Sequence, residues 1–113
     1  MKEIKAIIRP SKLLDVTEAL NEIEGLPGVT VSEIKGFGKG RAKIAQDKVV
    51  YEMVEFIPRI QLEVVVHKEM VDQVVNVIQR HSHTGNTGDG KIFVSTVDEV
   101  VKIRTNERGR EAI

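Results

Sequence analysis

A glycine-rich stretch combines a flexible backbone with a cation. It reads Thr84-Gly-Asn-Thr-Gly-Asp-Gly-Lys91 and runs into a predicted strand at Lys91. Glycines let backbone N–H groups point together at an anion, and lysine adds a point charge suited to phosphate. We therefore single out Gly88, Asp89, Gly90 and Lys91 as a candidate phosphate cradle. Because a strand follows rather than a helix, this is not a Walker A loop, and a plain turn is the alternative.

Two further groups of basic residues have types and spacing that suit phosphate binding. Gly36, Phe37, Gly38 and Lys39, followed by Gly40 and Arg41, form a second glycine cluster after a predicted strand. The alternative interpretation of this cluster is the flexible start of a loop. Lys102 and Arg104 lie two residues apart on a segment predicted to be extended, so both are expected to point the same way. The alternative for that pair is a solvated strand face.

Other chemistry has weaker support. His81 and His83 form an H-x-H step, but they follow a predicted helix and lack an obvious third ligand, so we predict no metal site. No carboxylate pair lies in a glycine-lined or apolar setting that would tune a catalytic pKa, which argues against an enzyme. No aromatic stacking stripe of the RNA-recognition type is present.

Composition limits the function classes. The chain has 113 residues, which predicts a single domain over residues 1–113. Lys+Arg and Asp+Glu are 17 each, and this zero net charge argues against bulk attraction to nucleic acid. There is no cysteine and no apolar run long enough for a membrane span, so we expect a cytoplasmic protein. Low net charge is also compatible with oligomerisation.

The elements that position these residues follow from periodicity. Strands are predicted at 3–9, 29–35, 60–66 and 91–97, and helices from Ser11 to just before Gly25 and over 68–80. Ser11 is the expected N-cap of the first helix. The order β-α-β-β-α-β predicts an α+β, ferredoxin-like sandwich with both helices on one sheet face. The strand at 60–66 is apolar on both sides, which favours a second subunit on the open face. The tail after Thr105 is expected to fray.

The sequence resembles the PII family of nitrogen regulatory signalling proteins over nearly its whole length. Thr84-Gly-Asn-Thr-Gly-Asp-Gly-Lys-Ile-Phe-Val matches the family's C-terminal signature, and Val31-Ser-Glu-Ile-Lys-Gly-Phe-Gly and Val101-Lys-Ile-Arg-Thr support it. The resemblance implies a homotrimer that binds ATP or ADP between subunits. It also implies a long flexible loop, about residues 38–56, that signals to a target protein, either a membrane transporter or a regulated enzyme.

The resemblance also implies roles for individual residues. It places Ile7, Thr30 and Val65 around adenine, Gly36, Phe37, Gly38 and Lys39 along the nucleotide, and Gly88, Asp89, Gly90 and Lys91 around the phosphates. Arg59 lies near the phosphates and the 2-oxoglutarate site, and Lys102 and Arg104 reach a neighbour's phosphates.

Three departures from the family pattern change what we expect. Glu52 replaces the modified tyrosine and Tyr51 is one residue away, which argues against uridylylation. Gly40 replaces the glutamine that holds magnesium and 2-oxoglutarate, which argues against 2-oxoglutarate sensing, although magnesium with the nucleotide stays compatible. Lys102 replaces arginine and loses its bidentate geometry. These features resemble the PII-NG subgroup, which accompanies heavy-metal efflux pumps. A metal-binding trimer of the CutA type is the alternative.

Overall fold

Four strands form one antiparallel sheet in the computed structural model, which describes residues 1–37 and 56–113. The strands are β1 (Lys2–Ile8), β2 (Thr30–Gly36), β3 (Ile57–Val66) and β4 (Lys91–Thr96). Their order across the sheet is β2-β3-β1-β4, so β1 and β3 lie at the centre. This order confirms the predicted ferredoxin-like fold, because each helix connects two strands that are separated by one other strand.

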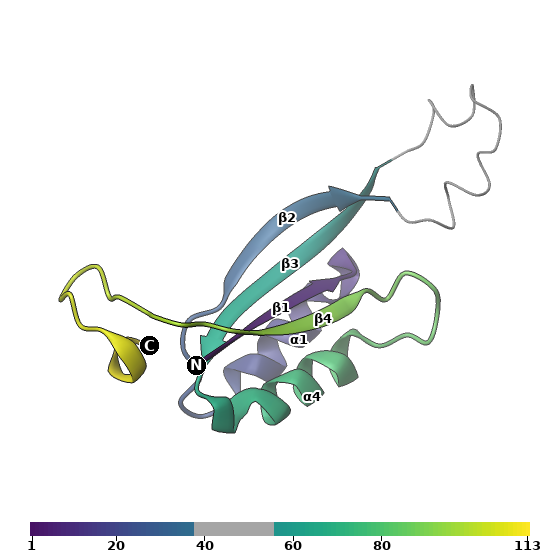
Figure 1. Ribbon diagram of the computed structural model, residues 1–113. Helices are drawn as coiled ribbons and strands as arrows, with labels where there is room; N and C mark the ends of the chain where they lie inside the picture. Colours follow the sequence, from purple (N-terminus) through teal and green to yellow (C-terminus); the bar gives the residue numbers. More distant parts are fainter. Residues whose placement is uncertain (38–55) are drawn as a thin grey trace.

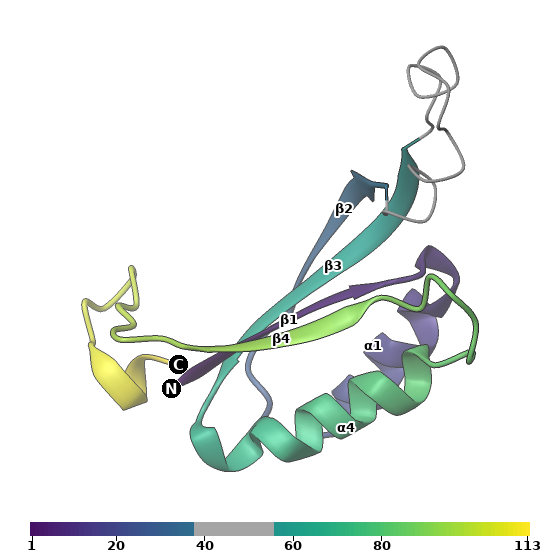
Figure 2. The ribbon, with the colours of Figure 1, turned by 45° about the vertical axis from the view of Figure 1, so that its right-hand side comes forward.

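Both helices cover the same face of the sheet. α1 (Leu13–Asn21) follows β1, and α4 (Val71–Ser82) follows β3. Figures 1 and 2 show α1 and α4 packed side by side beneath the sheet. Right-handed crossovers bring both helices to one side, so neither α1 nor α4 covers the other sheet face. No helix in the described ranges is long and apolar enough to cross a membrane.

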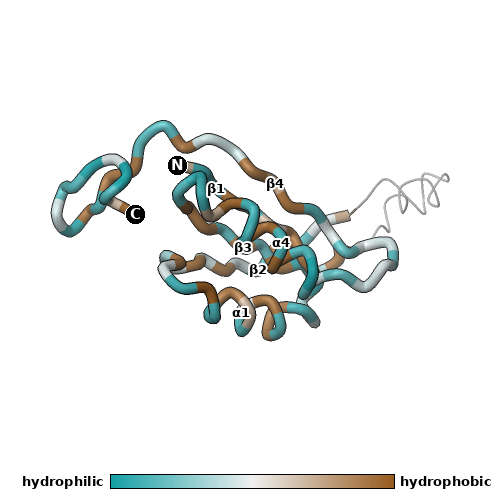
Figure 3. Tube along the Cα trace, turned by 90° about the horizontal axis from the view of Figure 1, so that it is seen from below, coloured by the Kyte–Doolittle hydropathy of each residue, from teal (hydrophilic) through white to brown (hydrophobic). Residues whose placement is uncertain are grey.

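The hydrophobic core lies between the helices and the sheet. Figure 3 shows apolar positions on α1 and along the strands that it covers. In β1 and β3 the buried residues alternate with half-buried ones, as expected when one face packs and the other stays open. The buried residues are Ile4, Ala6, Ile8, Ile60, Leu62, Val64 and Val66 in the strands and Val16, Leu20, Val74 and Ile78 in the helices.

Strand register decides which residues share the open face. Ile7 is paired with Gln61 on one side and with Lys91 on the other, and Thr30 is paired with Glu63. Side chains along a strand alternate between faces, so Gln61 and Glu63 of β3 share a face. The open face of β3 is therefore partly polar rather than apolar, which corrects the expectation of a strand apolar on both sides.

Two helix starts differ from the prediction. A 3-10 turn at Pro10–Lys12 precedes α1, and another at Lys68–Met70 precedes α4. Ser11 lies inside the first turn, and the residues flanking it make no side-chain capping bond, so the predicted N-cap was wrong. Proline at the first position of that turn presets the backbone and needs no donor there, which starts the helix without a hydroxyl cap.

The tail segment, residues 97–113, is folded rather than frayed. Val101 bridges to Arg108, and residues 103–105 between them form a turn, so the prediction that Lys102–Arg104 is extended was wrong. A 3-10 helix then spans Gly109–Ala112, and Ala112 is buried. The sequence pattern missed this return because only one apolar side chain anchors the helix.

Candidate functional site

Asp89 organises the glycine-rich loop between α4 and β4. Its Oδ2 accepts hydrogen bonds from the backbone N–H groups of Thr84 and Gly85, both at 2.8 Å, and its Oδ1 accepts the Thr84 hydroxyl. The Thr84 bonds, together with those from Arg9 and Gly85, hold the pKa of Asp89 well below its usual range. Because its oxygens are already bonded within the loop, Asp89 shapes the cradle rather than serving as a free anion.

Two arginines lie beside Gly88. Arg9 donates from Nε to Asp89 Oδ1 at 3.0 Å and from Nη2 to the Thr87 carbonyl at 2.7 Å. A Cβ on Gly88 would lie 3.2 Å from the Nη2 atoms of both Arg9 and Arg59. Gly88 also has a φ of +100°, a backbone region that favours glycine. The loop therefore presents backbone close to two guanidinium groups, a suitable setting for an anion.

Gly90 allows the loop to approach β1 closely. Its φ is +93°, and a Cβ built there would lie 1.7 Å from the Ile7 carbonyl oxygen. No other residue type fits this position without moving β1 or β4. The close approach fixes the start of β4 and thereby the place where Lys91 leaves the loop.

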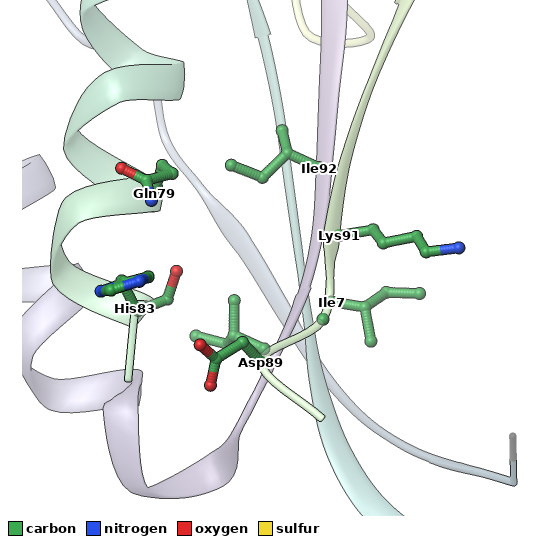
Figure 4. Close-up of a pocket in the computed structure, with 9 residues that line it drawn as sticks. Ile7, Gln79, His83, Asp89, Lys91 and Ile92 are labelled. Carbon is green, nitrogen blue, oxygen red and sulfur yellow. The ribbon is translucent and has the colours of Figure 1, made fainter. Parts of the chain in front are cut away.

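Lys91 and Ile7 point to the open face of the sheet. Figure 4 shows their side chains on one side, while Ile92 lies on the other side, toward Gln79 of α4 and His83 just after that helix. A pocket of about 390 Å³ lies on that helix side; Asp89 and Gly90 contribute to its wall, and Ile7 and Lys91 also border it. Because the Lys91 ammonium points away from this pocket, the candidate phosphate site lies on the opposite, open face.

The predicted base-binding residues share that open face. Thr30 is opposite Glu63, and Val65 lies two residues beyond Glu63 on β3, so both are on the same side as Ile7. Thr30 and Val65 also line one pocket of about 260 Å³. The open-face side chains of Ile7, Thr30, Arg59, Val65 and Lys91 thus lie on one surface, which hydrophobic periodicity without strand register does not reveal.

Lys102 and Arg104 do not join this group within one chain. They lie in the tail segment beyond the end of β4, whereas Lys91 begins that strand. Five strand steps separate the two ends by about 17 Å. Lys102 Nζ lies 4.0 Å from Glu107 Oε1, and Arg104 is exposed. Any role at a cradle therefore requires a second copy of the chain.

The second glycine cluster is only partly described. Gly36 ends β2, and the exposed Phe37 packs edge-on against Phe56, with ring centroids 5.4 Å apart. The predicted residues Gly38 and Lys39, most of the loop predicted over 38–56, and Gly40, Tyr51 and Glu52 lie outside the described residues. The aromatic pair joins the two chain segments that lead into this stretch.

Arg9 is the residue that sequence reasoning missed. It lies between the last residue of β1 and Pro10, and it contacts the loop through Thr87 and Asp89. The available signal was its place directly after a central strand, at the end of the sheet where β4 begins. Without the strand order, nothing in the sequence indicates that a cation eighty residues from Asp89 lies beside the glycine-rich loop.

No group of three metal-ligating side chains occurs in residues 1–37 and 56–113. His81 lies on α4 and His83 follows the helix end, near Gly85.

Comparisons with known proteins agree with this geometry. The family model "Nitrogen regulatory protein P-II" matches residues 1–107. The nitrogen regulatory protein P-II of Azospirillum brasilense and P-II 1 of Escherichia coli (strain K12) are each 47% identical over 113 residues, covering the full length of both chains in each case. Arabidopsis thaliana PII bound to citrate matches 99% of this chain and 91% of its own, with a TM-score of 0.79 and 38% identity. The chain belongs to the nitrogen regulatory protein P-II family of signal-transduction regulators, and not to a family of enzymes.

Proposed function

We propose that this regulator binds ATP or ADP, with magnesium where the nucleotide carries it, and that the bound nucleotide controls a target protein. The observation that supports this most strongly is the shared open face, where Ile7, Arg59 and Lys91 project beside the Gly88–Gly90 loop. Cations and a glycine backbone suit the phosphates, and the Thr30–Val65 pocket suits the base.

The proposed assembly is a homotrimer with sites between subunits. The open sheet face needs a cover, and the tail segment carries Lys102 and Arg104 away from the cradle of its own chain. A closed cyclic arrangement buries such a face without leaving open ends. In that arrangement the two tail cations approach a neighbour's phosphates, as the resemblance implies.

The proposed output acts through residues 38–56. A target is regulated only if it binds one nucleotide state better than the other, because equal affinity shifts nothing. The proposed target is a membrane transporter, such as a heavy-metal efflux pump, or a regulated enzyme, and the proposed location is the cytoplasm. We expect 2-oxoglutarate sensing to be lost because of Gly40, and uridylylation to be lost because of Glu52.

Replacing Lys91 by alanine tests the phosphate assignment. A charged hydrogen bond contributes about 1–3 kcal/mol, so ATP binding should weaken roughly fivefold or more in Lys91→Ala. Lys12→Ala, on the first helix turn, is the matched control and should bind as the unaltered chain does. Isothermal titration calorimetry measures both. Equal ATP affinity in Lys91→Ala and the control would remove Lys91 from the site.

A further inference from the structure

The tail segment presents two basic side chains on a hairpin that extends beyond the sheet. This tail hairpin, residues 100–109, contains Lys102 and Arg104 and turns where the Asn106 N–H donates to the Lys102 carbonyl at 2.8 Å. Figures 1 and 2 show it projecting past the ends of the strands. The direction in which its basic side chains lie therefore depends on what fixes the base of the hairpin.

Two attachments hold that base to the rest of the chain. On the outgoing side, the Val97 N–H donates to the Met1 carbonyl at 3.1 Å and continues the pairing of β4 with β1. On the returning side, the Gly109 N–H donates to the Val100 carbonyl at 2.9 Å, and the 3-10 helix of the tail segment follows at once. The returning side is therefore fixed by whatever this 3-10 helix contacts.

One buried and one charged side chain attach the 3-10 helix. Ala112 is buried, and Arg110 forms an ion pair with Glu69, with Arg110 Nη2 at 2.6 Å from Glu69 Oε1 and Nη1 at 3.5 Å from Oε2. The hydrogen bond from Arg110 is the largest cause that lowers the pKa of Glu69 to about 2, so this carboxylate is charged at neutral pH. Glu69 lies on the 3-10 turn Lys68–Met70 between β3 and α4, so the pair ties the tail segment to the packed part of the fold.

The tail segment is held by charges more than by apolar burial. Within the described residues, three ion pairs involve it: Lys102 with Glu107 at 4.0 Å, Arg108 with Glu99 at 3.2 Å and Arg110 with Glu69 at 2.6 Å. The first two join residues inside the tail segment, and the third reaches an element outside it. Ion pairs between exposed groups are screened by salt, so this attachment should be strongest at low ionic strength.

We propose that Arg110 and Glu69 are positioning residues for the nucleotide site of a neighbouring subunit, because their ion pair orients the tail hairpin toward that neighbour's phosphates. The inference rests on the proposed nucleotide binding and adds to it. Neither partner of the pair contacts the nucleotide in this arrangement, since they act through Lys102 and Arg104. A hairpin that is correctly oriented for only a fraction of the time lowers the apparent affinity by that fraction.

Charge reversal of the two partners tests this role by calorimetric titration with ATP at low ionic strength. Arg110→Glu replaces attraction by repulsion, so ATP binding should weaken roughly fivefold, the upper scale of one exposed ion pair. Glu69→Arg combined with Arg110→Glu restores the attraction and should return the ATP affinity to within about twofold of the unaltered chain. Arg80→Glu, at an exposed arginine on α4, changes the net charge as Arg110→Glu does and is the matched control, which should bind as the unaltered chain does.

A second background distinguishes positioning from a general effect on the fold. In a chain that already has Lys102→Ala and Arg104→Ala, the further change Arg110→Glu should leave ATP affinity unchanged. Residues that act through the same contact give non-additive effects, whereas independent effects on folding or assembly add. All variants are compared at one protomer concentration, because assembly makes binding depend on concentration.

The outcomes separate the positioning role from the proposed function. If the unaltered chain binds ATP and Arg110→Glu binds it as tightly as Arg80→Glu does, the positioning role is refuted alone. It is also refuted if the double reversal fails to recover affinity, or if Arg110→Glu causes the same loss with and without Lys102 and Arg104. Absence of ATP binding to the unaltered chain refutes the proposed function and this inference together.

Discussion

Gly90→Ala should destabilise the protein more than any other glycine substitution in the described loops. The new Cβ would lie 1.7 Å from the Ile7 carbonyl oxygen and 2.8 Å from the Ile7 carbonyl carbon, so backbone must move. Positive φ alone costs about 1–2 kcal/mol for a residue with a Cβ. Moving packed backbone adds about 1–3 kcal/mol. We therefore expect a total loss of about 2–5 kcal/mol in the free energy of unfolding.

Gly25→Ala separates the two costs. Gly25 has a φ of +78°, but nothing lies within 4 Å of a Cβ built there, so only the backbone strain remains. Urea unfolding of both variants at one fixed protomer concentration measures the difference, because assembly makes stability depend on concentration. Gly90→Ala should be less stable than Gly25→Ala by at least about 1 kcal/mol. Equal stability would refute the claim that the loop is fixed by its contact with β1.

Two other predictions concern carboxylates held by hydrogen bonds. Folding lowers the pKa of Asp89 from 3.8, so the stability that its charged form contributes is complete above pH 3.8 and is lost as pH falls through the lower folded value. Asp89→Asn should therefore melt at a lower temperature than the unaltered chain at pH 7, and this difference in melting temperature should be smaller at pH 2. A difference that stays the same at both pH values would contradict the loop geometry. Glu69→Gln should speed hydrogen exchange at Gly109–Ala112 while leaving β1 and β3 protected, and unchanged exchange there would mean that the Arg110 pair does not anchor the tail segment.

Hydrophobic periodicity predicts the fold because each element buries a regular stripe. β1 and β3 alternate with period two, and Val71, Val74 and Ile78 recur at helical spacing, so element type and order follow directly. The tail segment has no comparable stripe. Its return depends on one buried alanine, one ion pair and a hairpin of backbone bonds, none of which a periodic pattern encodes.

The candidate site follows from sequence only in part. Three glycines and Lys91 indicate the cradle because glycines let backbone N–H groups point together at an anion and lysine adds a positive charge. Arg9 and the role of Asp89 depend on which strand end meets which loop, and this information lies in the sheet order. The contact between Asp89 and the phosphates stays a prediction, and the hydrogen bonds from the loop backbone to its side-chain oxygens were not foreseen.

Calorimetric titration of the unaltered protein with ATP and with ADP, each with magnesium and with or without 2-oxoglutarate, measures nucleotide binding at the open face itself. We expect one nucleotide to bind per protomer with an affinity that 2-oxoglutarate leaves unchanged, because Gly40 offers magnesium no side-chain ligand. Tighter ATP binding with 2-oxoglutarate would contradict the loss of that input. No binding of either nucleotide would contradict the assignment of the open face as a nucleotide site.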